Sequence, residues 1–209
     1  MKIPDFEKGG STMRKALVVM TVLVLCTAFL FTSCAMLGGK PSESNFKGPV
    51  ITLESFMVPQ YDGFWLYGPK AKPDLGDAGG HGAPLPMTFL FNVENQNKYP
   101  VQLDGYQFTV AFDGFDLVTV NNNDVCWIPP ETTNQVRATT MITVTSARLS
   151  LLVAGGFKLQ EKKMNANDAL QKWWTGVPDF SVPVTVHEGA FSFRAGGVSK
   201  VMPFEATFP

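Results

Sequence analysis

Few side chains of this 209-residue chain are of a type and spacing that could do chemistry. The sequence has three cysteines and two histidines. Neither histidine, His81 or His187, stands at a zinc-like spacing from a cysteine or from the other histidine. No Gly-x-Ser-x-Gly elbow and no phosphate-binding loop occurs in the sequence. We therefore expect no catalytic residue, no cofactor and no metal site, and we expect the protein not to be an enzyme.

Acidic residues give weak alternatives to this expectation. Asp74, Asp77 and His81 fall within eight residues, and carboxylates are ligands that Ca²⁺ accepts. They lie in the segment Gly68–Pro86, which has five Gly and four Pro in nineteen residues. A segment this long and this rich in Gly and Pro is typical of a functional or disordered loop. We interpret the three side chains as solvated, and the run Asn121–Asp124 as a polar turn.

Carbohydrate chemistry has two candidate features. A glycosidase needs two carboxyl groups at a set separation, and Asp113 and Asp116 flank a predicted hairpin turn. Solubility explains acidic residues at that position. Trp173 and Trp174 could stack on sugars, but such a pair more often packs a helix onto a sheet, so core packing is our prediction.

Cys34 follows a segment with the features of an export signal. Ala16–Phe31 has sixteen uncharged residues after Arg14 and Lys15, and a basic start, an apolar stretch and small residues make a secretory signal peptide. The sequence Phe31-Thr32-Ser33-Cys34 resembles the bacterial lipobox. That resemblance implies cleavage before Cys34 and acylation of its thiol and amine, with palmitate or a similar chain. An uncleaved transmembrane anchor is the alternative, although the stretch is short for a bilayer span.

The predicted organisation follows from this signal. Residues 1–33 are the signal peptide, with a true start predicted at Met13. Residues 34–48 are the lipidated cysteine and a flexible tether, and residues 49–209 are one domain. Ala35, rather than Asp, follows the cysteine, which resembles sorting to the periplasmic face of the outer membrane.

Composition excludes nucleic acid as a partner of the exported part. Without the four basic and two acidic side chains of residues 1–33, 13 basic and 16 acidic side chains remain, a net charge of −3. A slightly acidic domain has no electrostatic footprint for nucleic acid. Cys126 is then left without a cysteine partner, and its apolar neighbours predict a buried structural thiol.

The hydrophobic pattern predicts an all-β domain. Apolar residues alternate with polar ones in segment after segment, with turn residues between them, which is typical of an antiparallel β-sandwich or barrel. Ser146–Ala154 and Asn165–Thr175 have helical features, with Asn165 or Asn167 as the cap of the second. The predicted strands cover residues 87–93, 106–112, 115–119, 136–144, 182–186, 191–193 and 198–208. The predicted core includes Phe89, Phe91, Tyr106, Phe108, Val110, Phe112, Val184 and Phe193.

Residues 91–106 carry a family resemblance. The run Asn95-Gln96-Asn97, then Tyr106 and the turn Asp113-Gly114, resembles late embryogenesis abundant group 2 proteins, whose module is the water stress and hypersensitive response (WHy) domain. Gln96 stands where that family has Pro. The closing segment from Val186 to Phe208 resembles the family's last hairpin, with a turn near Glu188-Gly189. The resemblance implies an immunoglobulin or fibronectin type III-like sandwich with one or two short helices.

Two functions follow as expectations. The resemblance implies a lipoprotein with a non-catalytic β-sandwich that protects the cell envelope during desiccation stress. The alternative is an envelope interaction module that holds a partner protein and has no stress role. In both, the lipid on Cys34 attaches the domain to the membrane. The two asparagines of Asn95-Gln96-Asn97 are predicted to form a turn.

Overall fold

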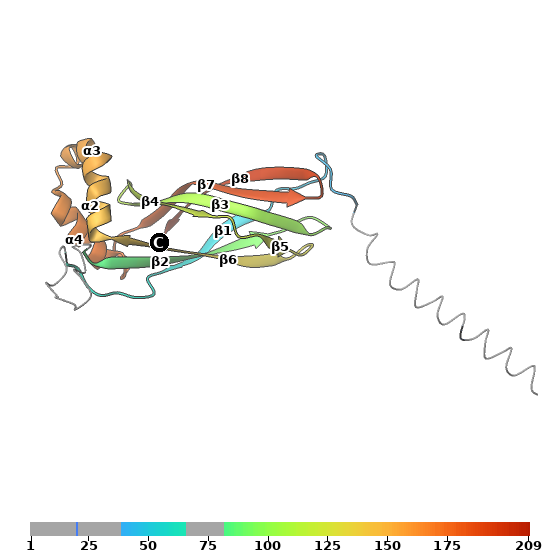
Figure 1. Ribbon diagram of the computed structural model, residues 1–209, viewed down its shortest axis with the longest axis horizontal. Coiled ribbons are helices and arrows are strands. Elements are labelled where there is room, and N and C mark those ends of the chain that lie inside the picture. Colours follow the sequence, from blue (N-terminus) through green and yellow to red (C-terminus); the bar gives the residue numbers. More distant parts are fainter. Residues whose placement is uncertain (1–19, 21–38, 66–81) are drawn as a thin grey trace, which may run out of the picture. The chain divides into compact units, whose positions relative to one another are not determined.

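The computed structural model describes residue 20 and residues 39–65 and 82–209 (Figure 1). The chain divides into two compact units, residues 1–40 and 41–209. All the strands that the structure describes belong to the second unit. They are β1 (Val50–Met57), β2 (Pro84–Glu94), β3 (Val101–Phe112), β4 (Phe115–Asn122), β5 (Cys126–Ile128), β6 (Thr133–Thr143), β7 (Val184–Ala195) and β8 (Val198–Phe208).

These strands form two antiparallel sheets packed face to face. The smaller sheet has the order β1-β2-β6, and the larger has the order β4-β3-β7-β8 with β5 paired to β3. The predicted all-β sandwich, immunoglobulin-like or fibronectin type III-like with short helices, is confirmed at the level of this architecture. Each antiparallel sheet packs one face against the other sheet and exposes the opposite face, which accounts for the alternating pattern along the strands.

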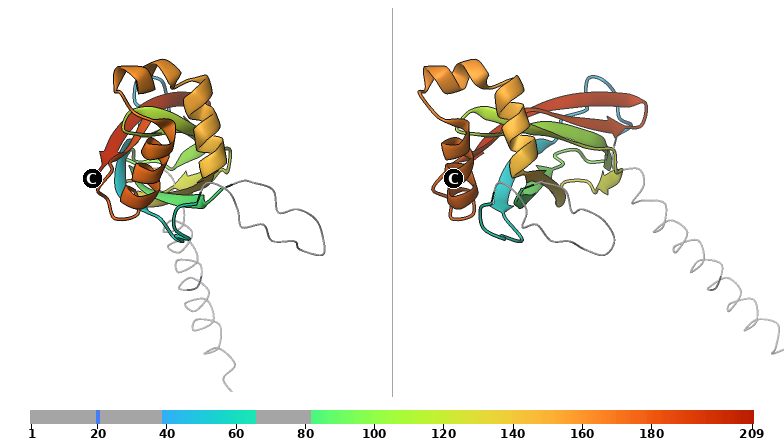
Figure 2. Two further views of the ribbon diagram at one scale, coloured as in Figure 1. Left: turned by 90° about the vertical axis from the view of Figure 1, so that its left-hand side faces the viewer. Right: turned by 60° about the vertical axis from the view of Figure 1, so that its left-hand side comes forward.

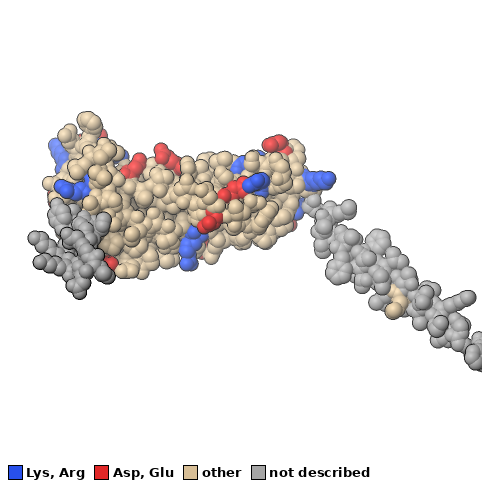
Figure 3. Space-filling model, viewed as in Figure 1, with Lys and Arg blue, Asp and Glu red and all other residues tan. Residues whose placement is uncertain are grey.

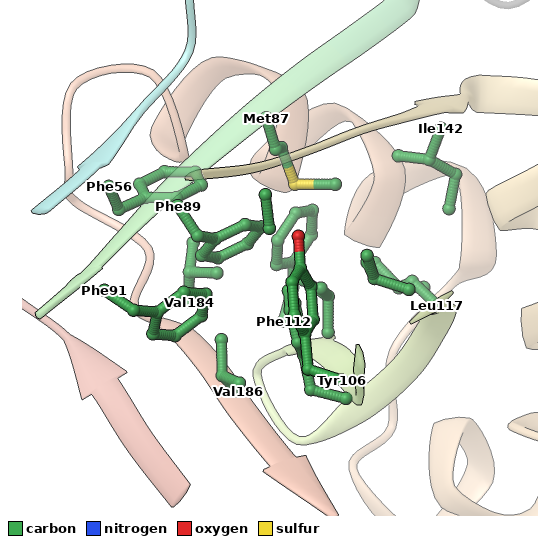
Figure 4. Packing of buried hydrophobic residues seen from close by; sticks show 14 of the residues in the cluster. Phe56, Met87, Phe89, Phe91, Tyr106, Phe112, Leu117, Ile142, Val184 and Val186 are labelled. Atoms are coloured by element: carbon green, nitrogen blue, oxygen red, sulfur yellow. The ribbon is translucent and has the colours of Figure 1, made fainter. Parts of the chain in front are cut away.

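Aromatic side chains fill the space between the sheets (Figure 4). Phe89 and Phe91 of β2 meet Phe108 of β3 edge to face, with ring centroids 5.3 and 5.4 Å apart. Tyr106 stacks on Phe191 at 5.1 Å. Such pairs contribute about 0.5–1.5 kcal/mol each beyond the apolar area they bury. All the predicted core residues are buried, so alternation identified the inner face correctly.

Three helices cover one end of the sandwich (Figure 2). The predicted helices are confirmed as α2 (Val144–Val153) and α4 (Ala166–Gly176), and Asn165 caps α4 by accepting from the Asn167 N–H at 2.8 Å. A third helix, α3 (Gly156–Glu161), was not predicted. It has six residues, too few for a helical period to show in the sequence.

The predicted loop Gly68–Pro86 ends earlier than expected, because β2 already begins at Pro84. Proline has no backbone N–H to donate to a neighbouring strand, so it is found where a strand is unpaired on one side. At Pro84 and Pro86, β2 pairs with β6 on one side, and its pairing with β1 begins only at Thr88. Among the described strands, β2 is therefore paired on one side only at the two prolines. The preceding residues 66–81, with Asp74, Asp77 and His81, lie outside the described residues.

The compact unit starts at Pro41 rather than at residue 49, so the segment predicted as tether is partly folded. Phe46 is 2% exposed. Its carbonyl accepts from Lys200 Nζ of β8 at 2.6 Å, and Lys47 exchanges two hydrogen bonds with the Asn97 side chain, at 2.7 and 2.9 Å. Residues 41–48 are therefore part of the sandwich.

Candidate functional site

Helix α2 has apolar side chains on two opposite faces. The face toward the sandwich is buried and consists of Val144, Ala147 and Leu151. Leu149, Leu152 and Val153 have the i, i+3, i+4 spacing of one helix face, and they are 63%, 57% and 79% exposed. Thr145 and Ser146 make the first turn of α2 polar and exposed, so the outer apolar face is confined to the second half of the helix. No element among the described residues covers the three side chains of this face.

Helix α4 shows what a helix with one contact face looks like in the same molecule. Trp173 and Trp174 are fully buried, whereas Gln171, Lys172 and Thr175 face solvent. The outer apolar face is therefore a feature of α2, and Phe157 of α3 is a further exposed apolar side chain, at 90%. We call the three side chains Leu149, Leu152 and Val153 the apolar crest.

A hollow of about 400 Å³ adjoins the apolar crest. Helix α2 provides Leu149, Ser150 and Val153 as one wall, and β4 provides residues 116–119 as the other. On its floor, the hydroxyl groups of Thr109 and Thr119 lie 3.2 Å apart. We call this open depression the α2–β4 hollow; its lining is mainly apolar on both sides, and its polar groups are those of Asp116, Thr109, Thr119 and Ser150.

One acidic side chain, Asp116, lines the α2–β4 hollow, and a second, Glu188, contacts Thr109 of its lining. Asp116 Oδ1 is 2.9 Å from His187 Nε2, and the Asp116 side chain is 60% exposed. Glu188 Oε2 accepts from the Thr109 hydroxyl at 3.3 Å. Figure 3 shows acidic groups on the sandwich beside the raised helical end. Asp116, which we attributed to solubility, therefore has a defined partner.

The pair of His187 and Glu188 lies in a β-bulge, and the predicted turn near Glu188-Gly189 is wrong. The register of β7 against β8 shifts between Val186 and Gly189, and Glu188 has φ +52°. A bulge re-aims the side chains of a strand. The hairpin turn follows β7 instead, at Gly196, where φ is +59°.

The contacts of these groups form no catalytic relay. A nucleophile needs a base within hydrogen-bond reach. The Thr109 hydroxyl is engaged with Thr119 and Glu188, while His187 bonds to Asp116. Among the described residues, no group of three or more His, Cys, Asp or Glu side chains could hold a metal ion.

Asp113 fixes the helical end to the sheet, which the sequence did not indicate. Its Oδ2 accepts from Lys172 Nζ and from Trp173 Nε1, each at 2.7 Å. Its carbonyl accepts from Lys162 Nζ at 2.7 Å. Burial acts to raise the pKa of this carboxyl, but the two side-chain hydrogen bonds and the charges of Lys172 and Lys162 outweigh it, so the pKa of Asp113 is lowered. The predicted core packing of the two tryptophans is confirmed, since both are fully buried.

Asn95 and Asn97 do more than form a turn. Asn95 Nδ2 donates to the carbonyls of Tyr99, Ile128 and Pro129 at 2.9, 3.1 and 2.9 Å. Its Oδ1 accepts from the backbone N–H and the Nδ2 of Asn97 at 3.0 and 2.9 Å. Asn95 thus joins the β2–β3 loop to the segment after β5, and Asn97 joins the same loop to Lys47.

The cysteine predictions have different outcomes. Cys126 is partly rather than fully buried, and burial raises the pKa of its thiol, which disfavours a reactive thiolate. Cys34, the predicted lipid attachment site, lies outside the described residues. Among the described residues, no helix is long and apolar enough to cross a membrane.

Comparison with known proteins assigns no family. No family model matches the chain, and no curated protein matches it. Among solved structures, the chain is similar to a protein from Archaeoglobus fulgidus, with 13% identity and a TM-score of 0.40, over 75% of this chain and 94% of that one. It is also similar to a Northeast Structural Genomics Consortium target, with 9% identity and a TM-score of 0.41, over 78% and 88%. Similarities at this level carry no argument about function.

Proposed function

We propose that this protein is a lipid-anchored, non-catalytic binding domain of the bacterial cell envelope, and that it holds a partner protein at its helical end. The observation that carries the proposal is the second apolar face of α2. Leu149, Leu152 and Val153 are each more than half exposed, and exposed apolar patches bordered by polar groups mark interaction sites.

The place of the apolar crest in the domain suits this role. Residues 41–48 lie at the end of the sandwich opposite to α2, α3 and α4 (Figure 1). Strand β3 runs between the two ends with twelve residues, which span about 40 Å. The chain from Cys34 to Pro41 spans at most about 25 Å. Acylation of Cys34 would therefore hold the domain by the end that is far from the apolar crest.

Site-specific photocrosslinking tests the proposal in intact cells. A benzophenone amino acid at Leu152 should form adducts with a protein of the envelope. The same probe at Gln171, on the solvent face of α4, is the matched control and should give none. Equal labelling at the two positions would contradict a binding face on α2.

A stress-protective role is the second candidate function. It is favoured by Asn95-Gln96-Asn97, which follows β2 and precedes β3, as the resemblance to the WHy family requires. Survival of a deletion strain after drying measures this role. Unchanged survival would leave partner binding as the function to pursue.

A further inference from the structure

We propose that the α2–β4 hollow takes a segment of a partner protein that carries large apolar side chains next to a basic one. The apolar side chains would lie on Leu149 and Val153, and the basic group would bond to Asp116, with the Glu188 carboxylate nearby on Thr109. This inference rests on the proposed function and specifies the chemistry of the partner.

The apolar half of the site follows from the walls of the hollow. Leu149 and Val153 line it and also belong to the apolar crest. An apolar side chain of the partner that packs on Leu149 and Val153 would bury apolar surface of both proteins. Each Å² buried would stabilise the complex by about 25 cal/mol. The other residues that line the helical side of the hollow are Ser150 and Ala154, which carry no charge.

The preference for a basic group follows from the carboxylates of Asp116, in the lining of the hollow, and of Glu188, next to it. A carboxylate has about four acceptor sites, and the contacts of Asp116 and Glu188 with His187 and Thr109 use one oxygen of each. Both acidic residues remain accessible to solvent. Two carboxylates beside one histidine favour a cationic group, and a guanidinium can bond to a carboxylate through two N–H groups.

The same charges argue against the two other occupants. An anionic membrane surface would be repelled by Asp116 and Glu188. A second copy of the chain would have to offer a basic group at its own apolar crest, where Arg148 of α2 is only partly exposed, with its Nε buried, and Lys158 and Lys162 of α3 are engaged within the chain. Lys158 and Lys162 donate to the carbonyls of Gly114 and Asp113, and both lie over the Phe115 ring.

Selection from a random peptide display library on the detergent-solubilised full chain tests the proposal. The selected peptides should be enriched in Arg or Lys adjacent to large apolar residues. A synthetic selected peptide should bind at least about tenfold more weakly to Leu149→Asp and to Asp116→Lys, as for other contacts at the centre of an interface. The matched control, Gln171→Asp on α4, should leave its affinity unchanged. The double reversal Asp116→Lys with Glu188→Lys should shift the selection toward acidic peptides.

Each other outcome overturns the proposal in a distinct way. Selected peptides that bind Leu149→Asp and Asp116→Lys unchanged would place the site elsewhere and leave the proposed function standing. Apolar peptides without basic residues would refute the role of the carboxylates. A dimer in sedimentation equilibrium that Leu149→Asp dissociates would make a second copy the occupant. If no peptide is selected, this inference fails, and the crosslinking at Leu152 decides separately whether the domain binds a partner.

Discussion

Replacing Asn95 with alanine should destabilise the sandwich more than any other single polar substitution in its loops. The side chain is fully buried. It supplies both donor hydrogens and its acceptor oxygen to five contacts with four residues, Tyr99, Ile128, Pro129 and Asn97. Alanine would leave the carbonyls of Tyr99 and Ile128 without this donor, and the Pro129 carbonyl with the Thr132 hydroxyl alone.

The magnitude follows from the number of hydrogen bonds lost. A hydrogen bond contributes about 1 kcal/mol net, and a buried group left without a partner costs about 1–3 kcal/mol. With two hydrogens donated and two hydrogens accepted by Asn95, the free energy of unfolding should fall by about 3–5 kcal/mol. That is a large share of the roughly 5–15 kcal/mol by which domains of this kind are stable.

Chemical unfolding of residues 41–209, followed by circular dichroism, measures the loss. Gln96→Ala is the matched control, because Gln96 is exposed and bonds to Glu94 on the surface at 3.3 Å; it should cost less than about 0.5 kcal/mol. Asn95→Asp replaces the donor with an oxygen that faces three carbonyls, so its destabilisation should grow as the pH rises and the carboxyl ionises. A loss below about 1 kcal/mol for Asn95→Ala, with an unchanged m value, would refute the reasoning, because it would mean that these groups find other partners.

Three further predictions use the same measurement or a simple fractionation. A fragment that begins at Pro49 should have a free energy of unfolding about 3 kcal/mol lower than one that begins at Pro41, because it lacks the buried Phe46. Equal stability of the two fragments would mean that residues 41–48 are a tether and not part of the sandwich. Because the pKa of Asp113 is lower in the folded than in the unfolded state, its contribution to stability is present above the unfolded pKa and is lost as the pH falls through the folded one. Asp113→Asn should therefore flatten the acid side of the stability profile, and an unchanged profile would contradict the Lys172 contact. Cys34→Ala should release the domain from membrane fractions, and an unmodified Cys34 in the mass spectrum of the mature wild-type protein would refute lipid anchoring.

Elements with a clear period could be predicted from the sequence, and short or context-dependent ones could not. From Tyr106 to Phe112, strand β3 has buried apolar residues at alternate positions, which tertiary packing requires of a strand with one inner face, whereas the register shift between Leu103 and Gly105 separates residues 101–105 from this pattern. Strand β5 has three residues and α3 has six, and neither length shows a period. Residues 41–48 have the composition of a tether, and they are fixed by partners far along the chain, such as Asn97 and Lys200.

The candidate site was hidden from the sequence for a related reason. Asp116 and His187 are 71 positions apart, and the bulge that brings Glu188 to Thr109 depends on the register of β7. One signal was nevertheless present. The stretch from Leu149 to Val153 contains four apolar residues in five, more than a single helix face can hold.

The two ends of the sandwich differ in how fully their polar groups are hydrogen-bonded and their apolar side chains are buried. At the end of residues 41–48, Asn95 and Asn97 use their amide groups in hydrogen bonds to the backbone of neighbouring segments. A loop region with its polar groups paired in this way gains little from a partner, since binding would break contacts that it already has. At the helical end, Asp113 and its lysine partners fix α3 and α4, yet the outer face of α2 is left in water. The exposed apolar side chains of α2 are held on a rigid helix. Their burial by a partner would stabilise the complex without a large entropy cost for ordering the chain. This contrast makes the helical end the part of the domain suited to binding, and it makes the opposite end the part suited to attachment.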